Sequence, residues 1–236
     1  MIKLLTLGID IGGTTTDLAC FENGKLIHVL SVRADDPVTS ASGALGKFIS
    51  ESGKSLAEIQ QIAVTGVGAN PVGIDLFGIP LRQIDEFSAI GMGGLFLSGL
   101  KEAVVVSLGT GTAVVKAKGR SAQHLGGSGV GGGTLIGLSK YMLQVSDFEL
   151  LSEMAEKGDL SKVDLSIRDI AGDRLGNLPA NATASNFGKH SDKAGPEDMA
   201  FGIINLVCQT VGMLAVFASR THNTQKVVLT GKMTRL

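Results

Sequence analysis

The feature that most constrains this chain is a pattern that occurs twice: a β-strand, a turn of glycine and threonine, and a second strand. The first copy reads "LGIDIGGTTTDLACF", residues 7–21, and the second reads "AVVVSLGTGTAVVKA", residues 103–117. Helices and further strands follow each copy. A repeat of this kind predicts two similar α/β domains, at residues 1–100 and 101–236.

The first half reads as an antiparallel meander followed by alternating helices and strands. The dipeptide Asn23-Gly24 is a strong hairpin signal between two of the predicted strands. Pro37 is a typical first residue of a helix. The predicted elements are strands at 4–10, 15–21, 25–32, 61–66 and 81–84, a helix at 37–52, and a helix that begins near Glu86.

The second half repeats this order. Strands and turns are predicted over 103–127, a helix within 129–144, an amphipathic helix at 147–160, a polar loop at 181–190, and a strand at 226–231. A second domain that matched the first would continue with another helix and strand. We therefore expect a C-terminal piece beyond residue 236.

Residues 199–219, "MAFGIINLVCQTVGMLAVFAS", carry no charge and are long enough to span a bilayer. However, Gly202, Asn205, Gln209 and Gly212 follow helical spacing and form a small, polar stripe on one side. This pattern favours a buried central helix that begins near Pro196. A membrane span is the alternative.

Composition points to a globular protein with small partners. Of 236 residues, 44% are hydrophobic and 18% charged, and the net charge of −1 favours neither nucleic acid nor an anionic membrane surface. Cys20 and Cys208 are far apart in apolar settings, which is typical of reduced thiols and favours the cytoplasm. The N-terminus lacks the pattern of a signal peptide.

Two of the turns are candidate phosphate sites. Asp10 ends an apolar run and is followed by Gly12, Gly13 and Thr14, where free N–H groups suit a phosphate and the carboxylate suits Mg²⁺, directly or through water. The second turn is 109–112, "GTGT". Two such hairpins, one per domain, can hold a polyphosphate from both sides. The alternative is two unrelated tight turns that need glycine.

A third candidate is "GGSGVGGGTLIGL", residues 126–138, with six glycines within eight residues before an apolar helix. Its backbone N–H groups suit a nucleotide phosphate or ribose, but a flexible hinge is also possible. A fourth is Asp85-Glu86, where a carboxylate could accept a proton from a hydroxyl that attacks a phosphate. On position alone, acids favoured by the helix dipole are the simpler interpretation.

Together and in this order, these motifs resemble the type II pantothenate kinases of bacteria and their eukaryotic relatives, in the superfamily of actin and the sugar kinases. The resemblance is carried by "GIDIGGTTTD", "DEFSAIG", "SLGTGTAVV", "GGSGVGGGTLIGL", "SDFELL" and "TASNFGK" and extends over nearly the whole chain. It implies an α/β fold of two duplicated actin-like, or ribonuclease H-like, domains around a nucleotide cleft.

The resemblance also implies the activity: ATP-dependent phosphorylation of the terminal hydroxyl of pantothenate, the first step of coenzyme A biosynthesis. It implies Mg²⁺ at Asp10 and a cytoplasmic homodimer formed through the long helices of the second domain. Glu86 matches the catalytic base. The positions that match contacts to ATP and its phosphates are Asp10, Gly12, Gly13, Thr14, Thr15, Gly109, Thr110, Gly111, Gly132, Gly133, Thr134 and Phe148.

The resemblance assigns Thr112, Ala113 and His124 to the substrate, and two of these depart from the family pattern. His124 stands where an arginine usually holds the pantothenate carboxylate, and Ala113 where a serine is usual. Neutral histidine lacks the bidentate charge of arginine. Two alternatives therefore stay open: a kinase for another small hydroxylated acceptor, and a nucleotide-binding ATPase or switch without such an acceptor. Feedback by coenzyme A is also open.

Overall fold

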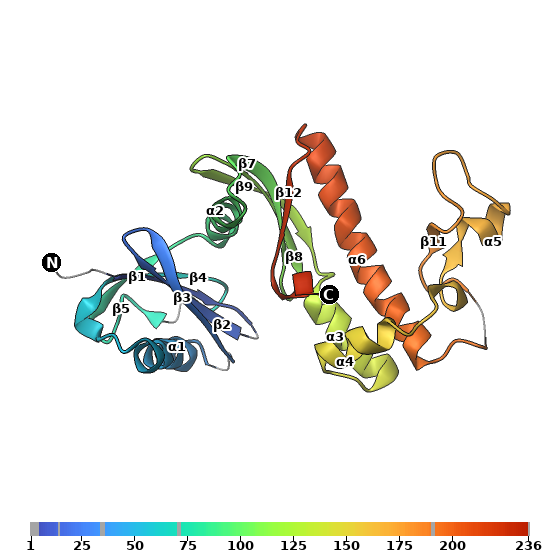
Figure 1. The fold of residues 1–236 in the computed structure, drawn as a ribbon. Coiled ribbons are helices and arrows are strands. Elements are labelled where there is room, and N and C mark those ends of the chain that lie inside the picture. The colour runs from blue at the N-terminus through green and yellow to red at the C-terminus, as the bar shows by residue number, and fades with distance from the viewer. Residues whose placement is uncertain (1–4, 14, 34–35, 70–71, 190–191, 236) are drawn as a thin grey trace. The chain divides into compact units, whose positions relative to one another are not determined.

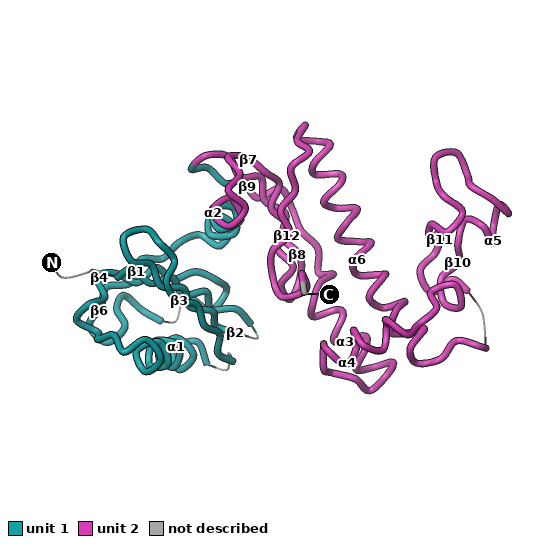
Figure 2. The backbone as a smooth tube through the Cα atoms, in the orientation of Figure 1, with its two compact units in different colours: residues 1–93, 120–123 teal, residues 94–119, 124–236 magenta. Residues whose placement is uncertain are grey.

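The computed structural model describes residues 5–13, 15–33, 36–69, 72–189 and 192–235 (Figure 1). The chain divides into two compact units (Figure 2). Unit 1 contains residues 1–93 and 120–123, and unit 2 contains residues 94–119 and 124–236. The domain boundary at residue 100 stays a prediction.

Unit 1 is built on a six-stranded sheet in the order β3-β2-β1-β4-β6-β5. Strands β1, β2 and β3 are antiparallel, as the sequence predicts, whereas β4 runs parallel to β1 and β6 parallel to β4. Asn23 and Gly24 take positive φ angles of 52° and 77° at the β2–β3 turn. The strands are β1 (Leu5–Ile11), β2 (Thr15–Glu22), β3 (Lys25–Arg33), β4 (Ile59–Thr65), β5 (Asp75–Leu76) and β6 (Ile79–Gln83).

Helix α1 (Pro37–Ser52) covers one face of this sheet, with the bounds that the sequence predicts. Asp36 caps it by accepting a hydrogen bond of 2.7 Å from Thr39 N, and Gly53 ends it with a φ of 67°. Its buried side chains form one core with alternate residues of β1 and β2. The other alternate residues, Asp10 and Asp17 among them, therefore lie on the opposite face. The remaining helices of this part of the chain are η1 (Leu56–Glu58) and α2 (Glu86–Ser98).

Unit 2 repeats this arrangement with a four-stranded sheet in the order β12-β7-β8-β9. Strands β7 and β8 are antiparallel, and β12 runs parallel to β7, as β4 does to β1. The predicted repeat is therefore confirmed. The strands are β7 (Glu102–Leu108), β8 (Thr112–Lys118), β9 (Ser121–Ser128) and β12 (Val227–Thr230).

The helices of unit 2 bury a second core. Leu135 of α3 (Gly132–Leu143), Leu151 of α4 (Phe148–Ala155) and Ile203 of α6 (Pro196–Thr221) are fully buried in it. Val104 and Val106 of β7 belong to the same core. Helix α4 ends before the predicted residue 160. The short elements are η3 (Leu160–Lys162), β10 (Leu165–Ser166), α5 (Ile167–Ala171), β11 (Thr183–Ser185) and η4 (Lys232–Arg235).

The prediction that the long apolar helix is buried is only partly right. One face of α6 enters the core, but Met213, Val216 and Phe217 are 45%, 39% and 55% exposed. Within the described part of the chain, α6 is the one helix long and apolar enough to cross a membrane, and 33% of its apolar window is buried. The predicted stripe is also divided, because Gly202 is buried whereas Gly212 is exposed. The core of unit 2 packs against one side of α6, so only that side of the helix is covered.

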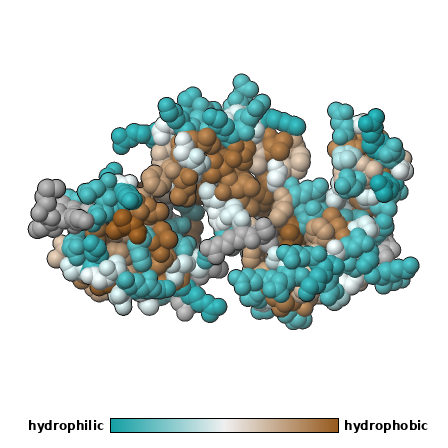
Figure 3. Space-filling model, in the orientation of Figure 1, coloured by the Kyte–Doolittle hydropathy of each residue, from teal (hydrophilic) through white to brown (hydrophobic). Residues whose placement is uncertain are grey.

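Hydrophobic side chains also remain on the surfaces of both sheets, where Figure 3 shows brown areas. They include Ile27 and Val29 of β3 in unit 1, and Val227 and Leu229 of β12 in unit 2.

Candidate functional site

The first predicted phosphate turn joins β1 to β2. Asp10 is the last residue but one of β1, Gly12 and Gly13 form the turn, and Thr15 begins β2. Gly12 N donates a hydrogen bond of 3.0 Å to Thr15 O, which closes the turn. Thr14 lies outside the described residues. The structure thus has a tight glycine turn here, but the N–H group of Gly12 is used to close it and is not free for a phosphate.

Asp10 lies in a negatively charged environment. It is the Cα partner of Asp17 in the antiparallel ladder, so the two carboxylates stand opposite each other. The pKa of Asp10 is raised above its ordinary value of 3.8, first by desolvation and then by the charges of Asp17 and Glu86. The sequence analysis missed Asp17. Its signal is the "DIGGTTTD" spacing, which brings the two ends together across a tight turn.

The end of β4 packs against Asp10. Gly66 has a φ of 92°, and a Cβ there would collide with Asp10 Oδ1 and lie 2.6 Å from Ile11 O. Gly68 N donates a hydrogen bond of 3.0 Å to Ile11 O. Only glycine permits this approach at residue 66. The sequence analysis interpreted this segment as a strand and missed its contact with the candidate site.

The two acids at the start of α2 have different environments. Asp85 accepts a hydrogen bond of 2.8 Å from Ser88 N and thereby caps the helix. Glu86 is the first residue of the helix, is exposed, and contributes to the electrostatic environment of Asp10. Helix capping therefore explains Asp85, and the role of Glu86 as a base stays a prediction.

The second turn and the glycine segment form one structure within unit 2. Gly132 N donates to Gly109 O at 2.9 Å, and Gly133 N donates to Thr110 O at 2.8 Å. These two N–H groups at the start of α3 are therefore used by the turn. The predicted phosphate nest at residues 132–133 has to be corrected, because it has fewer free donors than expected.

The glycines of this segment are required by close backbone contact. A Cβ on Gly131 would lie 2.7 Å from Gly111 O, and one on Gly111 would lie 2.7 Å from Ser128 O. A Cβ on Gly127 would collide with Thr112 O. Because the backbone is tightly packed here, the structure does not favour the flexible-hinge interpretation.

Three predicted side chains have partners or surroundings that bear on their roles. Thr112 is 5% exposed, and its Oγ1 donates to Val130 O at 2.8 Å, so this hydroxyl joins the turn to the glycine segment. The predicted substrate contact by Thr112 is therefore corrected. Thr134 Oγ1 donates to Gly129 O at 2.9 Å. Phe148, at the start of α4, packs partly against the core of unit 2.

The other predicted substrate residues lie on the sheet of unit 2. Ala113 is on β8 and is partly buried, and His124 is on β9 and is exposed. Both strands belong to the same sheet as the second turn.

The family follows from the second half of the chain. The family model described as Fumble matches residues 100–236. The chain belongs to the Fumble family. The type II pantothenate kinase of Staphylococcus aureus strain USA300 is 29% identical to it over 238 residues, which cover 96% of this chain and 84% of that protein.

Solved structures show the fold of this Fumble-family chain. The activator of the 2-hydroxyisocaproyl-CoA dehydratase from Clostridium difficile with bound ADPNP has a TM-score of 0.69 and 20% identity, with 98% of this chain and 81% of that chain covered. The ROK hexokinase of Thermus thermophilus has a TM-score of 0.54 and 14% identity, with 97% and 82% covered. The predicted actin-like α/β fold is confirmed.

A buried carboxylate that the sequence analysis missed organises the loop before α6. Asp164 is 2% exposed and accepts hydrogen bonds from Asn205 Nδ2 at 2.7 Å and Phe187 N at 2.9 Å. Thr183 Oγ1 and Asn186 Nδ2 donate to it as well. The predicted polar loop at 181–190 therefore contains β11, which pairs with β10.

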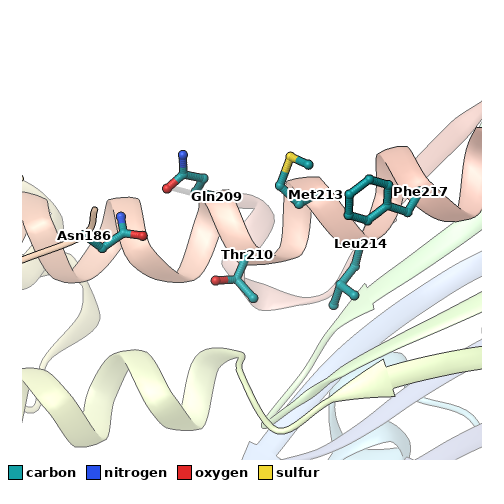
Figure 4. A pocket seen from close by; sticks show the side chains of 6 residues that line it. All are labelled: Asn186, Gln209, Thr210, Met213, Leu214 and Phe217. Atoms are coloured by element: carbon teal, nitrogen blue, oxygen red, sulfur yellow. The ribbon is translucent and has the colours of Figure 1, made fainter. Parts of the chain in front are cut away.

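This loop and the Fumble-family helix α6 border a shallow hollow of about 360 Å³ (Figure 4). Of the side chains that line the hollow, Asn186 lies at one end and Phe217 at the other. The hollow is lined by Asn186, Gln209, Thr210, Met213, Leu214 and Phe217.

Proposed function

We propose that this Fumble-family protein is a type II pantothenate kinase, which transfers the γ-phosphoryl group of ATP to the terminal hydroxyl of pantothenate, the first step of coenzyme A biosynthesis. The observation that carries the proposal is the likeness to the Staphylococcus aureus type II pantothenate kinase over 96% of the chain. The family match over residues 100–236 supports it independently.

Mg²⁺ is part of the proposal, with Asp10 as its ligand. Desolvation and then the neighbouring charges of Asp17 and Glu86 raise the pKa of Asp10, and a bound cation would offset the repulsion between these charges. No group of three metal-ligating side chains occurs among the described residues. A Mg²⁺ ion that is held by one carboxylate and by nucleotide phosphates fits this donor set. When bound, it neutralises charge on the transferred phosphoryl group.

Glu86 is the proposed general base. It stands at the start of α2, exposed and electrostatically linked to Asp10, so its carboxylate can accept the proton of an attacking hydroxyl. From the first turn, the proposed phosphate contacts are Gly13, Thr14 and Thr15. In unit 2, the proposed nucleotide contacts are Gly109, Thr110, Gly111, Thr134 and Phe148.

Two residues of the unit 2 sheet bear on the identity of the acceptor. His124 and Ala113 occupy positions where the resemblance led us to expect arginine and serine. A kinase for another small hydroxylated acceptor is the second candidate, and these two residues are the observation that favours it.

We also propose a cytoplasmic homodimer formed through α6. Met213, Val216 and Phe217 expose large apolar surfaces on this helix, and association of two copies would cover them. Sedimentation of the wild type and of Phe217→Glu tests this part: a dimer that the substitution converts to monomers supports it, and a monomeric wild type contradicts it.

The deciding experiment measures ATP consumption by the protein with Mg²⁺, with and without pantothenate, beside Glu86→Gln. We expect turnover that requires pantothenate and falls about a hundredfold or more in the variant, since a general base contributes about two to four decades in rate. The variant should still bind Mg²⁺–ATP. Equal turnover without pantothenate, together with intact ATP binding, would redirect the search to other acceptors.

A further inference from the structure

Thr65 lies at the end of a central strand of the unit 1 sheet. It ends β4, which lies between β1 and β6. Strands β1 and β4 are parallel, and Thr65 is the Cα partner of Asp10. Side chains at paired positions of neighbouring strands point to the same face. Thr65 therefore lies beside Asp10, on the strand between the one that carries Asp10 and the one that leads to Glu86.

The hydroxyl of Thr65 is an unusual group for this position. Its Oγ1 is buried and has no hydrogen-bond partner among the residues that the structure describes. Leaving a buried hydroxyl unpaired is unfavourable, and most buried polar atoms in folded proteins have a partner. The side chain thus has an unused donor next to the carboxylate that we propose binds Mg²⁺.

The residue after Thr65 lies close to the carboxylate of Asp10. Gly66 approaches Asp10 Oδ1 so closely that a Cβ would collide with it, and its φ of 92° suits glycine. The bond from Gly68 N to Ile11 O, at 3.0 Å, ties the same turn to the end of β1. The carboxylate of Asp10 therefore lies against the backbone that follows Thr65.

The negative charges around Asp10 indicate that a ligand of this site would include a cation. Asp17 stands opposite Asp10 in the ladder, and Glu86 adds a further negative charge. A carboxylate with two like-charged neighbours, beside an unpaired hydroxyl, favours a ligand that brings a cation and oxygen acceptors together. A magnesium nucleotide has both.

We propose that Thr65 Oγ1 donates a hydrogen bond to an oxygen of the Mg²⁺–nucleotide bound at Asp10. The acceptor is a phosphoryl oxygen or a water molecule of the cation. This inference rests on the proposed function, from which it takes the nucleotide, and it adds Thr65 to the residues that bind it.

The test uses two threonines, Thr65 and Thr16, whose buried Oγ1 atoms both lack a partner among the described residues. Thr65→Val keeps the shape of the side chain and removes the hydroxyl, and Thr65→Ser keeps the hydroxyl. Thr16 is fully buried on β2, at an alternate position to Asp17 and thus on the other face of the sheet. Thr16→Val is the matched control.

Calorimetric titration with a non-hydrolysable Mg²⁺–ATP analogue measures the affinity of each protein. We expect about a tenfold loss for Thr65→Val, because a hydrogen bond to a charged group is worth about one to two decades. Thr65→Ser and Thr16→Val should bind like the wild type.

Thermal unfolding without ligand accompanies the titration, and Thr65→Val should be at least as stable as the wild type. If Thr65→Val does not fold, Thr65→Ala has to show the same loss of affinity. A wild type that binds the analogue and a Thr65→Val that binds it equally well would overturn this inference alone. A Thr65→Val variant in which only the KM of the acceptor changed would overturn this inference as well. A wild type that does not bind the analogue would overturn the proposed function and this inference together.

Discussion

Asp10 and Asp17 stand directly opposite each other on β1 and β2, on the face of the sheet that α1 does not cover. Two carboxylates at such positions repel each other when both are ionised. Desolvation is the largest cause of the raised pKa of Asp10, followed by this repulsion from Asp17 and by the charge of Glu86. The ligand-free fold therefore tolerates an unfavourable charge arrangement that a bound cation would relieve.

Asp17→Asn should stabilise the ligand-free protein at neutral pH. Like charges directly opposite in a ladder cost a few tenths to about 1 kcal/mol, so we expect the free energy of unfolding in urea to rise by up to about 1 kcal/mol. Because Asp10 has a higher pKa in the folded protein than its ordinary 3.8, its contribution to stability falls as pH rises above that value. The gain from the substitution should shrink toward pH 4. A variant less stable than the wild type at neutral pH would contradict this account.

Gly131→Ala should be destabilising, whereas Gly129→Ala should not. A Cβ on Gly131 would lie 2.7 Å from the backbone of Gly111, but a Cβ on Gly129 meets no atom within 4 Å among the described residues. Overpacking of this kind costs about 1–3 kcal/mol. Urea unfolding of both variants checks the difference, and nucleotide titration should show weaker binding for Gly131→Ala only. Equal stability of the two variants would show that the segment can shift to make room.

Asp164→Asn should lower the free energy of unfolding by about 2–4 kcal/mol, because an amide replaces a buried carboxylate that accepts several hydrogen bonds. Its NH₂ group would also face donors such as Asn205 Nδ2. Asp147→Asn is a suitable control, since Asp147 is an exposed cap of α4 and asparagine caps a helix equally well. Chemical unfolding of the two variants in parallel makes the comparison. A loss as small as that of the control would mean that Asp164 does not hold this loop.

His124→Arg should lower the KM of pantothenate about tenfold and leave the KM of ATP unchanged. An arginine on β9 would offer a carboxylate a charged, bidentate partner, which is worth one to two decades in affinity. Steady-state kinetics with each substrate varied in turn measures both constants. An unchanged KM for pantothenate would place its carboxylate elsewhere, or would favour a different acceptor.

Local signals in the sequence predicted most of the elements. The bounds of α1 follow from Asp36, Pro37 and Gly53, and the turn at Asn23-Gly24 sets the register of the β2–β3 hairpin. The repeated strand-turn-strand unit predicted both sheets. These features depend on residues close together in the chain, so short-range rules are sufficient for them.

Features that depend on distant residues could not be predicted in this way. The position of Thr65 next to Asp10 requires the pairing of β1 with β4, which no local pattern specifies. The bonds of Asp164 join residues up to 41 positions apart. The exposed side of α6 was missed for a related reason: apolar composition indicates that a helix can be covered, but not what covers it.

The contact between the second turn and the glycine segment is made by backbone alone at Gly109–Gly132 and Thr110–Gly133. A contact of this kind contains almost no side-chain atoms, so amino-acid substitutions can do little to adjust it. Relatives that diverge in substrate preference should therefore keep this region nearly unchanged and diverge on the neighbouring strands. Positions 113 and 124 lie on such strands, and both already differ in this chain from the residues that the resemblance led us to expect.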